Sequence, residues 1–321
     1  MAAPIVQSVT APSNGAYAAG ANLAFTVNFD QAVLVDTGGG VPYISLTLDS
    51  GGTVQAAYAS GSGSNALVFT YAVQPGDADP DGVVVGGSIS SNGGLIQNAG
   101  LEVADPTLNS VAATTGVLVD TTAPAVSSVS VPANATYTTG EHLDFTVNFD
   151  EAVTVDTTGG TPRIALTLDN GGTVYANYLS GSGSSALVFR YDVGAGVSDA
   201  NGVTVGAMSA NGGTLRDAAG NDATATLNSV GSTAAVLVDG AARLAIAATS
   251  ASLAEGSGGG TTAFTFTVTR SNDTTGAATV DYAVTGSGGS PADAADFGGA
   301  LPHGTVSFAA GEATKLITIN V

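Results

Sequence analysis

A long tandem repeat, with a period of about 120 residues, constrains the fold of this chain more than any other feature. The segment AFTVNFD at residues 24–30 returns as DFTVNFD at 144–150, and both copies close on VLVD, at 117–120 and at 236–239. Because a repeat of this length is the size of an independent domain, it predicts separately folded units in series and not a solenoid of small repeats. We therefore expect one repeat over 1–120, a second over 121–240, and a different domain over 241–321.

Each copy carries β-strand signals separated by turn signals. Apolar residues at 143, 145, 147 and 149 alternate with polar ones, which is the pattern of a half-buried strand. Sequences such as DNGG at 169–172 and SGSGS at 180–184 favour turns between strands. In the second copy the expected strands are at about 125–131, 143–149, 162–168, 173–179, 185–193, 202–208 and 224–238. About seven antiparallel strands in a unit of this size predict an all-β protein of tandem immunoglobulin-like β-sandwiches in an elongated array, with the alternating apolar residues as core.

The charge balance narrows the classes of partner. The chain has 26 acidic and 6 basic residues and no cysteine. Nucleic acids and anionic lipid surfaces need clustered Lys and Arg, so we expect no nucleic-acid partner and no binding to lipid head groups. No apolar run approaches the length of a membrane-spanning helix, so we expect no membrane insertion. The absence of cysteine excludes disulfides and cysteine zinc sites. Carboxylates in loops are suitable ligands for calcium, so we expect calcium as a structural cofactor. The alternatives are that the acidic residues only keep the surface soluble, or that they belong to the surface of a halophile protein.

The two copies are joined by a short linker, Asp120–Pro124. Proline fixes its own φ and restricts the residue before it, so the repeats should stand end to end. If strands alternate in direction, the end of repeat 1 and the start of repeat 2 bring acidic loops together. We expect an interdomain calcium site there, and its candidate ligands are Asp120, Asp150, Glu151, Asp156, Asp217 and Asp222. By the same count Asp49 and the loop 77–81 lie at the far end of repeat 1, and Asp169, Asp199 and Asp239 at the far end of repeat 2.

Other acidic residues are further candidates. Asp77, Asp79 and Asp81 begin like a calcium loop, but Ser88 stands where an EF-hand needs a glutamate. Asp239 is a candidate at the second junction. For every one of these residues the alternative is an ordinary turn, because aspartate bonds readily to its own backbone.

Several segments carry a resemblance to a known family: residues 143–149 (LDFTVNF), 155–162 (VDTTGGTP), 216–221 (RDAAGN) and the VDTTAP junction. Residues 3–239 resemble the immunoglobulin-like repeats of giant bacterial surface adhesins. The resemblance implies a repetitive stalk outside the cell, often exported without a cleaved signal and commonly stiffened by calcium.

Residues 241–321 resemble a Calx-β domain. The similarity rests on residues 254–256 (AEG), 264–270 (FTFTVTR), 279–282 (TVDY), 295–297 (ADF) and 304–312 (GTVSFAAGE). The resemblance implies that Glu255 and Asp296 can contribute to calcium binding. It also implies two further strands after residue 321, so we expect this domain to be C-terminally incomplete.

Catalytic patterns are weak. The two histidines, His142 and His303, lie in different expected domains, without a nucleophile motif, and there is no tryptophan platform for a glycosidase. We expect a non-catalytic stalk or adhesive fragment, monomeric and extracellular on a bacterial surface, that serves adhesion or biofilm formation beside other repeats of its parent chain. The alternatives are a module that binds an unknown glycan or protein through exposed loops, and the accessory β domains of a larger secreted enzyme.

Overall fold

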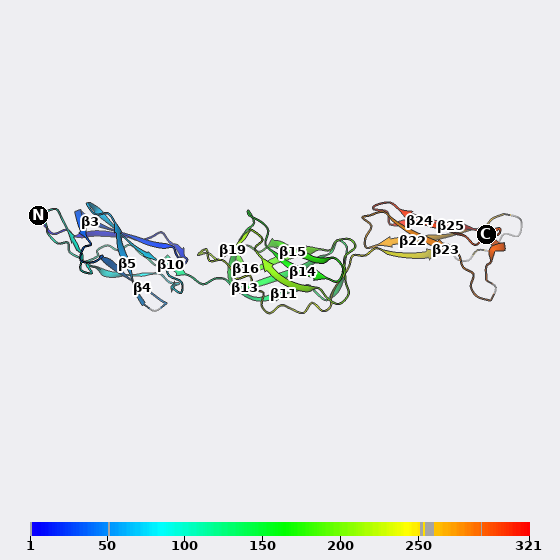
Figure 1. Cartoon of the computed structure of the whole chain (residues 1–321), viewed down its shortest axis with the longest axis horizontal. Helices are drawn as coiled ribbons and strands as arrows, with labels where there is room; N and C mark the ends of the chain where they lie inside the picture. The colour runs from blue at the N-terminus through cyan, green and yellow to red at the C-terminus, as the bar shows by residue number, and fades with distance from the viewer. Residues whose placement is uncertain (1, 51, 251–252, 254–259, 290) are drawn as a thin grey trace.

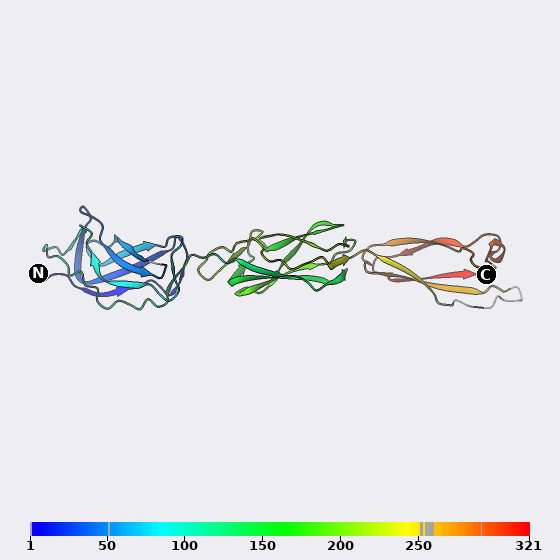
Figure 2. The same cartoon turned by 90° about the horizontal axis from the view of Figure 1, so that it is seen from below.

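The computed structural model describes residues 2–50, 52–250, 253, 260–289 and 291–321. Three β-rich units follow one another along the long axis of the molecule, and the chain termini lie at opposite ends (Figure 1). The view turned by 90° shows the same row of units (Figure 2). The prediction of an all-β protein is confirmed, since the described residues form strands and a single short 3-10 helix. No helix in this part of the chain is long and apolar enough to cross a membrane.

The first unit has a large and a small sheet. The large sheet has the strand order β1-β3-β6-β5-β4-β8, with β9 paired to β3, and the small sheet has the order β2-β10-β7. The strands are β1 (Val6–Thr10), β2 (Gly15–Tyr17), β3 (Asn22–Asp36), β4 (Tyr43–Leu48), β5 (Gly52–Ser60), β6 (Ser64–Ala72), β7 (Ala78–Asp79), β8 (Val84–Ser90), β9 (Leu95–Gln97) and β10 (Val117–Asp120).

The second unit repeats this topology strand for strand. Its large sheet has the order β11-β13-β16-β15-β14-β18, with β19 paired to β13, and its small sheet has the order β12-β20-β17. The strands are β11 (Val126–Ser130), β12 (Ala135–Thr138), β13 (His142–Asp156), β14 (Arg163–Leu168), β15 (Gly172–Ser180), β16 (Ser184–Asp192), β17 (Ser198–Asp199), β18 (Thr204–Ser209), β19 (Thr214–Arg216) and β20 (Val236–Asp239).

Two expectations about strands are wrong. The strand expected over 224–238 is confined to β20, because Val236 and Val238 are buried whereas residues 224–235 lack an inward apolar alternation and make only an isolated bridge through Val230. The assumption of purely antiparallel strands also fails, because β20 runs parallel to β12, as β10 does to β2.

The cores follow from the alternation seen in the sequence. Leu143, Phe145 and Val147 are fully buried, and Phe149 nearly so. Their neighbours in β14 and β16 complete a cluster that includes Ile164, and the first unit has a matching cluster of its own. Each repeat therefore encloses a hydrophobic core between its own strands.

The third unit is smaller and more open. A three-stranded sheet has the order β21-β22-β25, and β23 pairs with β24 in a second sheet. Its buried cluster consists of Val268, Val306, Phe308, Ile317 and Ile319. The elements are β21 (Arg243–Ala248), β22 (Ala263–Ser271), β23 (Ala278–Ala283), η1 (Ala294–Phe297), β24 (His303–Phe308) and β25 (Thr314–Asn320).

Candidate metal centres at the ends of the repeats

Three carboxylates meet where the first repeat joins the second. Asp120 ends β10, Glu151 lies within β13 and Asp217 follows β19; one carboxylate oxygen from each lies within 4.8 Å of the others. Asp120 belongs to one repeat and its two neighbours to the next. This group, which we call the junction cluster, therefore spans the linker.

The backbone of the 217–222 loop fixes the position of Asp217. Its Oδ1 accepts hydrogen bonds from the backbone N–H groups of Gly220 (2.7 Å) and Asn221 (2.9 Å), and its Oδ2 accepts one from Asn221 Nδ2 (2.7 Å). Asn221 Nδ2 also donates to the backbone oxygen of Asp120, at 2.9 Å. Asn221 therefore ties the loop of the second repeat to the last strand of the first.

The junction cluster has a concentration of negative charge with no basic partner. Burial, followed by the charges of Asp120, Asp217 and Asp150, raises the pKa of Glu151 above its ordinary value. Asp217 is only 6% exposed. Within the described residues no ion pair reaches any member of this cluster. Carboxylates held this close repel one another unless a proton or a cation lies among them.

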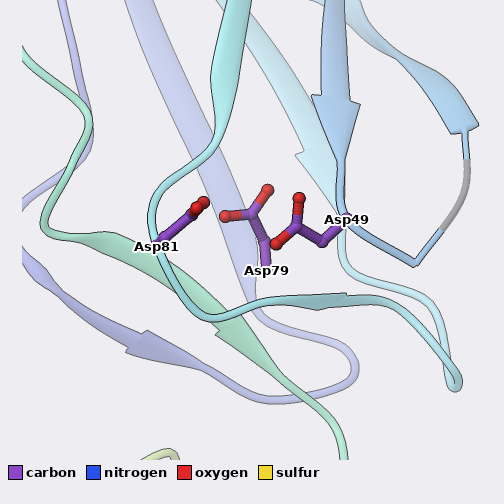
Figure 3. Close-up of side chains that lie close together, drawn as sticks. All are labelled: Asp49, Asp79 and Asp81. Carbon is purple, nitrogen blue, oxygen red and sulfur yellow. The ribbon is translucent and has the colours of Figure 1, made fainter.

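A second group, which we call the loop cluster, lies in repeat 1 at the end that carries Asp120. Asp49 follows β4, Asp79 ends β7 and Asp81 lies in the loop after it, again with carboxylate oxygens within 4.8 Å of one another (Figure 3). Asp79 is 2% exposed, and its pKa is raised mainly by burial, with the charges of Asp49 and Asp81 adding to the effect. Its Oδ1 accepts a hydrogen bond from Gly82 N at 2.7 Å. Gly82 is required here because its φ is +116° and a Cβ would lie 2.5 Å from backbone atoms of residues 114 and 115.

The second repeat fills the equivalent position with an amide. Asn201 stands where repeat 1 has Asp81, and its Nδ2 donates to Asp169 Oδ1 at 2.8 Å. Asp169 also accepts a hydrogen bond from Ala200 N, and Asp199 accepts one from the backbone of Asp169. An internal donor thus replaces the third negative charge, which leaves this turn less repulsive than the loop cluster.

The remaining predicted ligands have local partners. Asp150 accepts from Ala125 N, Asp156 accepts from Thr158, and Asp77 accepts from the Tyr71 hydroxyl and Gln74 N. Arginines pair with two others: Arg216 with Asp222, and Arg243 with Asp239. Asp296 accepts from Asp293 N at the start of η1, and Glu255 lies outside the described residues.

Sequence reasoning placed the loop cluster at the correct end of repeat 1 but did not name Asp49 as a ligand. The signal was available, because Asp49 directly follows the apolar alternation of β4 and the loop 77–81 was expected at the same end. The register confirms this end: Asp79 pairs with Val119, one residue before Asp120.

Both clusters could hold a metal ion. They offer hard oxygen ligands, without the nitrogen or sulfur donors that zinc sites use. His142 pairs with Asp192 in the second repeat, whereas His303 contacts a backbone oxygen in the third unit, so the two imidazoles are in different parts of the molecule. Neither a scan against protein-family models nor a search of curated proteins returns a match to this chain.

Proposed function

We propose that this chain is a non-catalytic shaft fragment of a secreted bacterial surface protein, serving adhesion or biofilm formation, in which calcium stiffens the junction between the repeats. The observation that carries the proposal is the junction cluster. Its three carboxylates come from both sides of a short linker and have no basic partner in the described structure. Calcium is favoured among cations because it takes six to eight oxygen ligands in flexible geometry.

A comparison with the start of repeat 1 supports a cation at the junction. The two positions that carry Glu151 and Asp217 in repeat 2 carry neutral amides in repeat 1. Gln31 and Asn98 correspond to Glu151 and Asp217. Both amides donate a hydrogen bond of 3.0 Å to the backbone oxygen of Ala2, and Asn98 Nδ2 lies 3.3 Å from Gln31 Oε1. Ionised carboxylates can only accept hydrogen bonds. The acidic pair of repeat 2 therefore lacks the N–H donors that the amide pair supplies at these positions, and a bound cation would offset the negative charge that the carboxylates bring instead.

Tandem sandwiches with such a junction suit a mechanical role. A cation that binds both repeats must be released before they separate or bend, so it opposes bending and stabilises the folded state by mass action. The resemblance to surface adhesins agrees with this role and with an extracellular setting, where calcium is plentiful.

The experiment is thermal unfolding in EDTA and in millimolar calcium, for the wild type and for the double variant Glu151→Gln/Asp217→Asn. This variant gives repeat 2 the amide pair that repeat 1 carries at the same positions. We expect calcium to raise the melting temperature of the wild type by several degrees, and the variant to show a smaller rise, because its loop cluster is unchanged. Asp222→Asn is the matched control, because this exposed carboxylate pairs with Arg216 outside the cluster and its loss should leave the calcium response intact.

An equal calcium response in the double variant and the wild type would contradict the proposed site. No response in the wild type would contradict calcium stiffening altogether and would leave the acidic residues as turn formers.

A further inference from the structure

The outer face of the large sheet distinguishes the second repeat from the first. The inward positions of the four central strands, β3 to β6 in repeat 1 and β13 to β16 in repeat 2, are the same in both copies, as in Phe25 and Phe145. Outward positions of the paired strands differ: repeat 1 has Ala24, Tyr43, Gln55, Ala57 and Thr70 where repeat 2 has Asp144, Arg163, Tyr175, Asn177 and Arg190. The shared fold does not require these changes. They place charged, aromatic and amide groups together on one surface, which we call the β14–β16 face.

Arg163 on this face is held in place but has no anionic partner. Its Cζ lies 3.8 Å from the centroid of the Tyr175 ring, and Tyr175 is 39% exposed. Within the described residues no carboxylate pairs with Arg163, whereas the neighbouring Arg190 is bound by both oxygens of Asp144 at 2.6 and 2.7 Å. Stacking covers one side of the guanidinium plane and leaves its in-plane N–H donors directed elsewhere. A carboxylate is the group that such a fork binds best.

The neighbours of Arg163 favour a sugar chain as the bearer of that carboxylate. The register places Asn177 directly across from Arg163, and it is exposed, as are Thr167 and Thr173. An aromatic ring, an amide and hydroxyls are suited to sugar rings and sugar hydroxyls. A peptide could not add a strand here, because β15 already pairs with β14 on one side and β16 on the other.

We propose that the β14–β16 face of the second repeat binds an acidic polysaccharide built from uronic acids. Arg163 pairs with a carboxylate of the polymer, Tyr175 supports the guanidinium and contacts the adjoining ring, and Asn177 bonds a sugar hydroxyl. This goes beyond the proposed shaft function and does not depend on calcium, since the attraction comes from a guanidinium.

The test is isothermal titration calorimetry of the whole chain with a hexamer of galacturonic acid, in EDTA so that no calcium can bridge. We expect binding to wild type with one site, and a loss of affinity of roughly tenfold to a hundredfold in Arg163→Gln, since a hydrogen bond to a charged group has that effect. Arg163→Lys should bind with intermediate affinity, because it keeps the charge and loses the fork. Melting temperatures of both variants show whether the repeat remains folded.

A gain-of-function variant completes the test. Tyr43→Arg/Gln55→Tyr/Ala57→Asn copies the face onto repeat 1 and should raise the number of sites from one to two. Three results would overturn the proposal: no heat of binding in the wild type, equal affinity for neutral maltohexaose, or equal affinity for hexaglutamate, which would show recognition of any carboxylate chain. Unchanged affinity in Arg163→Gln would also overturn it.

Discussion

The two junctions of this molecule begin alike and are completed differently. Both repeats close on Val-Leu-Val-Asp, and in both an asparagine from the following unit donates to the backbone oxygen of the final aspartate: Asn221 to Asp120 at 2.9 Å, and Asn272 to Asp239 at 3.3 Å. The side chains then diverge. Asp239 pairs with Arg243, four residues on, whereas Asp120 meets Glu151 and Asp217.

This difference shows that a shared strand ending does not determine how its carboxylate is neutralised. At the second junction the neutralising charge is covalently part of the chain and is present in any buffer. At the first junction no basic side chain of the described residues pairs with the cluster, and we propose that a bound cation supplies the charge. We therefore expect calcium to control the first junction and to leave the second unaffected.

The largest effect is expected from Asp217→Ala. This change leaves the backbone N–H groups of Gly220 and Asn221 without their acceptor. A fully buried donor without a partner costs about 1–3 kcal/mol, and these donors are only partly buried, so we expect a loss near the lower end of that range. Urea unfolding should show this loss in EDTA and a larger loss in calcium, since the metal site is lost as well.

Asn98→Ala is the matched change in repeat 1, where Asn98 Oδ1 accepts from the backbone of Gly100 and Glu102. Its cost should be similar with and without calcium. An Asp217→Ala cost that does not depend on calcium would remove the distinction between the two repeats.

A smaller effect is expected from pH in the absence of metal. The pKa of Glu151 is raised in the folded protein by burial and by neighbouring carboxylates. The folded state therefore binds a proton more tightly than the unfolded state. The resulting stability is present below the ordinary glutamate pKa of 4.5, which applies to the unfolded chain, and is lost as the pH rises through the raised folded value.

Urea unfolding in EDTA across this window should show that the free energy of unfolding of the wild type falls with rising pH relative to Glu151→Gln. Calcium should reverse the trend, because the metal binds the ionised form. If the free energy of unfolding had the same pH dependence in both proteins, burial and the neighbouring carboxylates would not raise the pKa of Glu151.

Arg243→Ala addresses the second junction and should have a modest effect. The arginine side chain is 69% exposed, so its ion pair with Asp239 contributes about 0.2–1 kcal/mol. We expect the third unit to become more mobile relative to the second, equally in EDTA and in calcium, by fluorescence energy transfer between labels on these units. A calcium-dependent change would show that this junction also needs metal.

Asp156→Asn should have the smallest effect on calcium binding. The carboxylate bonds the backbone and hydroxyl of Thr158 within its own turn, and these bonds lower its pKa. The calcium-induced rise in melting temperature should be unchanged. A reduced rise would place Asp156 among the ligands after all.

Much of the fold could be predicted from the sequence, because the hydrophobic alternation at residues 143–149 reports directly on burial. The strand expected over 224–238 was too long, although the sequence carried the signal: residues 224–235 lack the apolar alternation that Val236 and Val238 show. The grouping of Asp120, Glu151 and Asp217 was partly predictable from strand direction, which brought them to one end. The sequence could not show which of the six candidate carboxylates would remain without a local partner. Asp222 pairs with Arg216 and Asp150 accepts from a backbone N–H group, and both contacts depend on the folded positions of these side chains.

The most direct test of the calcium-stiffened junction is small-angle X-ray scattering of the wild type and of Glu151→Gln/Asp217→Asn, each in EDTA and in millimolar calcium. When calcium is added, the maximum dimension of the wild type should increase and its range of conformations should become smaller. The double variant should give the same scattering profile in both buffers. Identical wild-type profiles in EDTA and in calcium would contradict the account, because the junction would then be held, or left free, without metal.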